Sequence, residues 1–245
     1  MKLDTDEESS IRSLALEVAL RAGELLLSTA PTNPVAKTSP TDIVTDADRA
    51  AEALIVEAIT KARPNDTIVA EEGGARSGGS GVIWVIDPLD GTVNFMYGLP
   101  NWCISIGIEG EMRAGIVYDP VRRDVMTDLD PSTPSLVTDL GSALIGTGFS
   151  YSSEVRARQA GVLAGLLPRV RDIRRAGSCA LDLAWVGTGR LDGFYEEDTH
   201  HWDVSAGLAI IEAAGGCVSN YGSLVIAAGN AHLHAKLEQI VLSLR

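Results

Sequence analysis

The chain has 245 residues, of which 45% are hydrophobic, and its formal net charge is −13 at pH 7. This length can bury a substantial core, and the acidic excess disfavours nonspecific nucleic-acid binding, in which cationic groups neutralise phosphates. No stretch approaches the roughly 18 apolar residues of a membrane span, and no apolar run follows a basic start as in a secretory signal. We therefore expect a cytoplasmic protein without membrane or direct nucleic-acid contacts.

In the first half of the chain, apolar residues recur at helical spacing in two segments, which predicts helices over about 7–28 and 47–62. Five glycines between positions 73 and 81 are typical of a mobile loop. Short apolar runs bounded by turn residues predict strands. The strands expected in this half lie at 67–70, 82–86, 103–108 and 114–118.

The second half alternates strands with helices. Its expected strands lie at 143–146, 172–175, 192–195, near 217, and at 224–227. Its expected helices lie at 152–167, 179–186, 203–213 and 231–242. This alternation predicts an α/β or mixed α+β architecture in layers, and we expect a single domain over residues 1–245.

The most informative stretch runs from Trp84 to Phe95 and reads Trp-Val-Ile-Asp-Pro-Leu-Asp-Gly-Thr-Val-Asn-Phe. An apolar strand leads to two carboxylates, Asp87 and Asp90, and Pro88 predicts that the chain leaves the strand there in one stiff turn. Hard carboxylate oxygens suit Mg²⁺, and free backbone N–H groups at the following turn suit an anion. Taken alone, this pattern is equally typical of a turn at a strand end.

Three further acidic segments have to be weighed with it. They are 42–48 at the start of the second helix, Glu71-Glu72 after a strand, and His201-Trp202-Asp203 ahead of a helix of small residues. In isolation, helix caps explain the first and the third, and a solvated loop explains the second.

Together the four segments resemble the inositol monophosphatase family of Mg²⁺-dependent phosphomonoesterases. The run from Asp87 to Phe95 resembles the first signature of that family, and the run from Trp202 to Gly216 resembles the second. The Asp-x-Val-Thr-x-x-Asp and Glu-Glu elements also appear in the expected order. The resemblance implies a layered α-β-α-β-α sandwich of the inositol monophosphatase and fructose-1,6-bisphosphatase type. It also implies a metal-binding half over about 1–140, a substrate-side half over about 141–245, and a homodimer.

The resemblance further implies two to three Mg²⁺ ions per site. Glu71, Asp87 and the Leu89 carbonyl would hold a first ion, and Glu71 thereby counts among the catalytic residues. Asp87 would bridge to a second ion that Asp90 and Asp203 also hold, and a third, weaker ion would lie near Glu71. Asp90 and Asp203 would lie beside the substrate as well.

The remaining implied roles concern water and substrate. Thr92 would orient the attacking water, held in turn by Asp48, and the Gly91 and Thr92 amides would receive the phosphate. Gly177, Ser178 and Cys179 would contact the hydroxyls of the alcohol together with Glu196, for which a solvated strand end is the alternative. These contacts favour a small phosphate ester as the partner of this protein.

Elementary chemistry agrees with this assignment. Carboxylates that converge without a metal repel one another and raise one another's pKa, whereas Mg²⁺ removes that penalty and activates water. No Cys, His or Ser has the setting of a covalent nucleophile, which favours direct attack by water. The expected substrate is myo-inositol monophosphate, with histidinol phosphate as runner-up and fructose 1,6-bisphosphate and 3′-phosphoadenosine 5′-phosphate behind it. A non-catalytic partner of transcription or ribosome-assembly machinery is the alternative of another class.

Several residues near these motifs stay open between two interpretations. Arg174 and Arg175 could steady a second phosphate, a subunit contact or a surface salt bridge. Trp202 is expected to be a packing anchor, and the adjacent His200 and His201 to be exposed. The cysteines, Cys103, Cys179 and Cys217, are odd in number and widely spaced, so they fit neither a disulfide framework nor a zinc site. Segments 119–140 and 218–226 are shorter than the family pattern, which bears on substrate preference because loops carry specificity.

Overall fold

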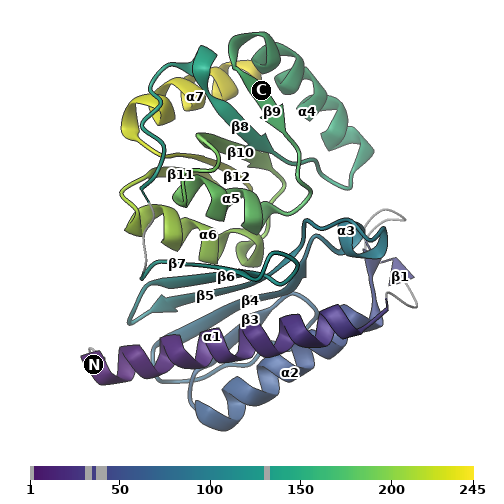
Figure 1. The fold of residues 1–245 in the computed structure, drawn as a ribbon, viewed down its shortest axis with the longest axis vertical. Coiled ribbons are helices and arrows are strands. Elements are labelled where there is room, and N and C mark those ends of the chain that lie inside the picture. Colours follow the sequence, from purple (N-terminus) through teal and green to yellow (C-terminus); the bar gives the residue numbers. More distant parts are fainter. Residues whose placement is uncertain (1–2, 31–34, 37–42, 130–132) are drawn as a thin grey trace.

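The computed structural model describes residues 3–30, 35–36, 43–129 and 133–245 and arranges them in five layers (Figure 1). Two helices cover the outer face of a first five-stranded sheet. Two further helices lie between that sheet and a second five-stranded sheet, and two more cover the far side (Figure 1). The predicted α-β-α-β-α sandwich is therefore confirmed. Asp42, which opens one of the predicted acidic segments, lies outside the described residues.

The first sheet has the strand order β3-β4-β5-β6-β7, in which β3 and β4 are parallel and the other neighbours antiparallel. Its outer face is covered by α1 (Thr5–Ser28) and α2 (Asp46–Ala62), and a two-stranded ribbon of β1 (Val35–Ala36) and β2 (Ile43–Val44) lies apart from it. The strands are β3 (Thr67–Ala70), β4 (Val82–Asp90), β5 (Cys103–Gly110), β6 (Ala114–Asp119) and β7 (Asp124–Thr127).

The second sheet has the order β11-β12-β10-β8-β9. Its strands are β8 (Leu144–Thr147), β9 (Asp172–Arg174), β10 (Gly193–Glu197), β11 (Cys217–Tyr221) and β12 (Leu224–Ala228). Its helices are α4 (Ser153–Leu166), α5 (Cys179–Gly187), α6 (His201–Ala213) and α7 (Ala231–Leu244), with short 3₁₀ turns at Leu140–Ser142 and Leu167–Arg169. The pair α5 and α6 forms the central layer, and α4 and α7 form the outer one (Figure 1).

The two N-terminal helices form where caps and apolar spacing agree. Asp4 accepts a hydrogen bond from the Glu7 amide (2.8 Å) and caps α1, whose small and β-branched positions Ile11, Ala15 and Val18 are fully buried. An N-cap of this kind satisfies one of the donors that the first turn of a helix leaves without an internal partner. These two helices and the strands β3, β5 and β6 confirm the predicted elements to within a few residues. Within the described part of the chain, no helix combines the length and the apolar character needed to cross a membrane.

One prediction for the first sheet was wrong, and one of its strands was not predicted. The chain does not leave the strand at Pro88, because β4 continues to Asp90 with a shift of register against β5 between Asp87 and Asp90. Proline lacks an N–H and is tolerated at such an irregularity. Strand β7 was not predicted at all, since Asp124–Thr127 is short and has no strong apolar alternation. The glycine-rich stretch is a loop as predicted, and its Gly79 and Ser80 amides donate to the Asn65 carbonyl (2.8 and 3.0 Å).

Candidate active site

A cavity of about 980 Å³ lies where the bulged end of β4 meets the starts of α5 and α6. It brings together residues that are more than 130 positions apart in the sequence. With one exception, the residues predicted for the site line it: Glu71, Asp87, Leu89, Asp90, Gly91, Thr92, Gly177, Ser178, Cys179, Glu196 and Asp203. The exception is Asp48, which lies behind Thr92 and touches its hydroxyl.

The irregular end of β4 explains how two carboxylates of one strand face one cavity. Side chains three residues apart in a regular strand point to opposite faces, and a bulge re-aims them. Asp87 accepts a hydrogen bond from the Leu89 amide at Oδ1 (3.0 Å). Asp90 Oδ2 accepts two, from the Ser178 hydroxyl (2.7 Å) and the Ala180 amide (2.6 Å). Hydrogen bonds from nearby backbone amides and from Ser178 thus hold both carboxylates in place.

Glu71 and Asp203 complete the acidic end of the cavity. The Glu71 amide donates to the Ile86 carbonyl (3.2 Å), which places Glu71 beside the last residues of β4. Asp203 lies in the first turn of α6, where its Oδ2 accepts a hydrogen bond from the His200 amide (2.7 Å). The interpretation of Asp203 as a helix cap and its interpretation as a site residue are therefore both compatible with the structure.

The electrostatics of this end show how close the acids are. Burial, and then the negative charges of Glu71, Asp90 and Asp203, raise the pKa of Asp87, whose side chain is 2% exposed. Burial and the charge of Asp203 raise the pKa of Asp90 to about 7. Such mutual repulsion is the cost of gathering carboxylates in a low-dielectric site.

The donor set fits a hard divalent cation, although it is not a closed cage. Within the described residues, no three His, Cys, Asp or Glu side chains are drawn together tightly enough to form a ready ligand set. The predicted ligands Glu71, Asp87, Leu89, Asp90 and Asp203 nevertheless offer carboxylate or carbonyl oxygens, the ligand type that Mg²⁺ prefers. The charges of three further carboxylates act on the buried Asp87, and a bound cation would offset that repulsion.

Thr92 and Asp48 form a hydrogen-bonded pair beside the acidic end of the cavity. Thr92 opens the short helix α3 (Thr92–Met96), and its hydroxyl donates to Asp48 Oδ1 (2.8 Å) while lying 3.1 Å from the Leu89 carbonyl oxygen. The other Asp48 oxygen accepts from the Thr45 amide (2.8 Å) and the Thr45 hydroxyl. The Thr92 hydroxyl directs its proton toward Asp48. The lone pairs of the Thr92 oxygen are therefore left to accept a hydrogen bond from a molecule in the cavity.

The opposite wall is built from the start of α5 and the end of β10. Ser178 caps α5 by accepting from the Leu181 amide (3.3 Å), and Gly177 before it has φ +94°, a conformation that favours glycine. The Glu196 carboxylate lies over Gly148, where an added Cβ would come within 2.1 Å of both carboxylate oxygens. Burial, followed by the charge of Asp203, raises the pKa of Glu196. Glu196 therefore lies half-buried in the cavity wall, and its contact with the alcohol stays a prediction.

The family is decided by comparison with known proteins. Residues 7–240 match the sequence model of a family described as "Inositol monophosphatase family". The chain belongs to the inositol monophosphatase family.

Individual relatives agree with this assignment. The chain is 43% identical over 203 residues to the inositol-1-monophosphatase of Mycobacterium leprae, which is 75% of this chain and 70% of that protein. It is 37% identical over 225 residues to the Nus factor SuhB of Escherichia coli K12, with 85% and 84% covered. Among solved structures, Mycobacterium tuberculosis SuhB superposes with a TM-score of 0.82 at 35% identity, over 97% of each chain. The suhB protein of Bartonella henselae reaches a TM-score of 0.88 at 30% identity, over 95% of this chain and 98% of that one.

The family resemblance did not reveal every residue of the cavity wall. Asp182 is 1% exposed, lines the cavity, and has no hydrogen-bond partner at Oδ1. Arg156 lines it as well. Asp182 lies one turn into α5, just after the predicted site residues Gly177–Cys179. Its helical spacing from Ser178 could have predicted that it faces the same cavity. Arg156 follows a turn of irregular sequence and carries no such signal.

The residues left open between two interpretations are now placed. Arg175 lines the cavity, whereas Arg174 is exposed and pairs with Asp172 (2.5 Å) on the surface. His200 and His201 are exposed, as predicted. Trp202 is half-buried, stacks on the His200 ring with 5.1 Å between ring centroids, and also lines the cavity. All three cysteines are free thiols.

Proposed function

We propose that this protein hydrolyses a small phosphate monoester in a Mg²⁺-dependent reaction, and that myo-inositol monophosphate is its substrate. The observation that carries the proposal is that Glu71, Asp87, Asp90 and Asp203 all line one cavity, close enough for the charges of the other three to raise the pKa of Asp87. Family membership supports the same conclusion, because the relative of 43% identity from Mycobacterium leprae is named for that activity.

The residues that would hold two to three Mg²⁺ ions are Glu71, Asp87, the Leu89 carbonyl, Asp90 and Asp203. When bound, Mg²⁺ would polarise the phosphoryl oxygens, lower the pKa of a coordinated water and stabilise the leaving alkoxide. The protein contributes the fixed orientation of these oxygens. Ser178 and Ala180 hold one Asp90 oxygen, and the other stays available for a cation.

Thr92 and Asp48 are assigned to the attacking water. Asp48 is held by Thr45 at one oxygen and accepts the Thr92 proton at the other, so the Thr92 oxygen is positioned as an acceptor for water. We assign the Gly91 and Thr92 amides to the phosphate. Burial raises the pKa of the Cys103 and Cys179 thiols well above its ordinary value. Since the thiolate is the reactive form of cysteine, neither thiol competes with water as the nucleophile.

Glu196 and Asp182 are assigned to the alcohol. The half-buried Glu196 and the buried Asp182 line the same cavity as the Gly177–Ser178 turn. Each carboxylate can accept hydrogen bonds from the hydroxyls of a polyol. The same pair would attract an ammonium group, and this favours histidinol phosphate as the second candidate. Arg156 and Arg175 are the cations that a second phosphate would meet, so fructose 1,6-bisphosphate and 3′-phosphoadenosine 5′-phosphate belong in the same comparison.

Phosphate release from these four esters, measured at equal concentration with Mg²⁺ or with EDTA, tests the proposal. We expect turnover only with Mg²⁺, fastest for inositol monophosphate, and most of it lost in Asp90→Asn. Asp172→Asn is the matched control, because that carboxylate is exposed and pairs only with neighbouring groups of β9. A folded Asp90→Asn variant with undiminished turnover would rule out the assigned site, and faster release from histidinol phosphate would overturn the substrate.

A role in transcription or ribosome assembly is the candidate of another class. It is favoured by the names of two relatives, the Nus factors SuhB of Escherichia coli and Pasteurella multocida, at 37% and 36% identity. Capture of RNA polymerase subunits in stoichiometric amounts by both the wild type and Asp90→Asn would support it. The homodimer, the cytoplasmic location and the division into a metal-binding and a substrate-side half stay predictions, the first of which light scattering can test.

A further inference from the structure

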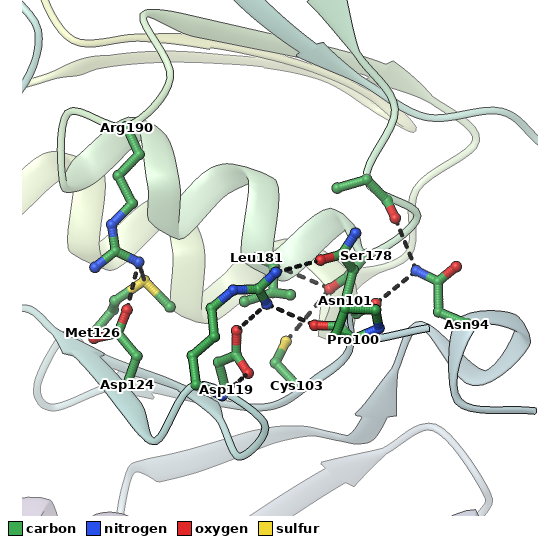
Figure 2. Close-up of polar contacts among 12 residues, drawn as sticks. Asn94, Pro100, Asn101, Cys103, Asp119, Asp124, Met126, Ser178, Leu181 and Arg190 are labelled. Carbon is green, nitrogen blue, oxygen red and sulfur yellow. Dashed lines mark hydrogen bonds and ion pairs between the residues drawn. The ribbon is translucent and has the colours of Figure 1, made fainter. Parts of the chain in front are cut away.

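One side-chain amide joins the two walls of the cavity. Asn94 lies in α3, two residues after Thr92, and is 6% exposed. Its Nδ2 donates to the Asn101 carbonyl (2.6 Å) and to the Ala176 carbonyl (2.8 Å). Figure 2 shows the Asn94 amide with two dashed contacts, one toward Asn101 and one toward the chain above it. The first carbonyl belongs to the loop before β5, and the second belongs to the turn that leads into α5.

The turn held by Asn94 is the one that positions Asp90. Gly177 packs directly on the Asn94 amide, since a Cβ added at Gly177 would lie 2.7 Å from Asn94 Nδ2. The next residue, Ser178, donates to Asp90, as does the Ala180 amide. A continuous path of short contacts therefore runs from α3, through the Ala176–Ser178 turn, to a carboxylate of the acidic end.

The other partner of Asn94 is itself fixed. Arg122 donates to the Asn101 side chain (2.7 Å), to the Pro100 carbonyl (2.6 Å) and to the fully buried Asp119 on β6 (2.6 Å). Its guanidinium lies 5.6 Å from the centre of the Trp185 ring on α5. Figure 2 shows its three partners, Asp119, Pro100 and Asn101, close to one another. Asn94 thus joins the turn before α5 to the loop at Asn101, which Arg122 anchors to the first sheet.

We propose that Asn94 is a positioning residue, which sets the distance between the Thr92 wall and the Gly177–Ser178 wall of the cavity. A primary amide is needed because it supplies two N–H donors from one nitrogen, one for each carbonyl. Aspartate has the same shape but supplies none, and its charge would face two carbonyl oxygens. This inference rests on the proposed function, in which the first wall receives the phosphate and the second receives the alcohol.

The ratio of kcat/KM for inositol monophosphate to kcat/KM for phenyl phosphate tests the inference, because phenyl phosphate lacks the hydroxyls that the second wall would bind. A misplacement of about 1 Å can cost roughly 100-fold in rate. We expect Asn94→Asp to lower the ratio about 10-fold or more through a higher KM for the inositol ester. We also expect the backbone amides of 177–181 to exchange hydrogen faster, a readout that does not depend on turnover.

Arg190→Ala is the matched control. Arg190 joins the chain after α5 to Asp124 and Met126 of β7, and it links the same two parts of the molecule away from the cavity (Figure 2). We expect this variant to keep the wild-type ratio and the wild-type exchange of 177–181. An equal fall in Arg190→Ala, or an unchanged ratio in Asn94→Asp, overturns the inference.

Two further measurements keep the inference testable. If Asn94→Asp does not fold, Arg122→Lys serves as a second variant. It weakens the contact with Asn101 but keeps a positive charge beside Asp119, and it should lower the same ratio by a smaller factor. An unchanged ratio in Arg122→Lys would contradict the inference. A wild-type protein that hydrolyses neither ester refutes the proposed function itself. Hydrolysis of both esters with an insensitive ratio refutes only the role of Asn94.

Discussion

Replacing Gly115 by alanine tests how closely α6 must lie on the first sheet. A Cβ built at Gly115 of β6 would lie 2.2 Å from the Ala206 carbonyl oxygen, 2.9 Å from its carbonyl carbon and 3.0 Å from its Cα. Ordinary van der Waals contact begins at 3.4 Å, so helix and strand must separate by about 1.2 Å. The obstructing atoms are backbone atoms, which cannot rotate away as the end of a side chain can.

The separation has a stability cost and a functional cost. Overpacking a tight interface costs roughly 1–3 kcal/mol, occasionally more, and a rigid backbone contact places Gly115→Ala near the upper end, at about 3 kcal/mol. Asp203 lies one turn before Ala206 on the same helix. Under the proposed function, a shift of about 1 Å at this carboxylate would also lower turnover roughly 100-fold.

Urea denaturation with linear extrapolation measures the loss of stability. Gly79→Ala is the matched control, because a Cβ at Gly79 meets nothing within 4 Å, and it should change the free energy of unfolding by no more than about 0.5 kcal/mol. The reasoning is refuted if Gly115→Ala is as stable as Gly79→Ala.

Three further predictions concern stability. Gly161→Ala lies in α4 with open space around the new methyl group, so it should stabilise the protein by about 0.5–1 kcal/mol; a lower melting temperature by circular dichroism would contradict this. Burial raises the pKa of Asp66, but hydrogen bonds from Arg63, Trp84 and Ser80 outweigh it and leave that pKa below its ordinary value. The stabilisation is therefore complete above the unfolded-state pKa of about 3.9 and is lost as the pH falls through the folded-state pKa. Denaturation should show Asp66→Asn about 2 kcal/mol less stable than the wild type at pH 7, with the gap closing toward pH 3; a gap independent of pH would refute the assignment. Under the proposed function, Mg²⁺ should raise the melting temperature of the wild type by mass action, and a rise of the same size in Asp90→Asn would speak against the site.

Local patterns in the sequence predicted most helices and strands, whereas the order of the five layers came from the family resemblance. Amphipathic spacing and caps were enough for α1 and α2, and short apolar runs were enough for most strands. The register shift at Pro88 was missed, because a proline between two acids is typical of a turn, and only pairing with β5 reveals that the strand continues. Strand β7 was missed for a related reason, since four residues carry too little pattern without the neighbour that pairs with them.

The candidate site depended more on resemblance than on pattern. Thr92 and Asp48 are 44 positions apart, and no spacing rule predicts the 2.8 Å contact between them. The Asn94 bridge to Ala176 spans 82 positions and belongs to the same class of contacts. Such contacts follow from tertiary packing, which local propensity does not encode. The residues of a motif can be predicted from the sequence, whereas the hydrogen bonds between distant motifs can be found only in a structure.

The placement of Asp203 shows why the site cannot belong to either half alone. The sequence assigns α6 to the second half, yet α6 packs on β4, β5 and β6 of the first sheet and also against α5. Gly107 and Gly115 make that approach possible, since a Cβ at either would lie within 2.2 Å of α6 atoms. The acidic end is therefore incomplete in a chain cut near residue 140, which would lack Asp203 and the turn that holds Asp90. Under the proposed function, Mg²⁺ binding would therefore require α6, so the proposed catalytic site forms only when both sheets have folded around this central layer.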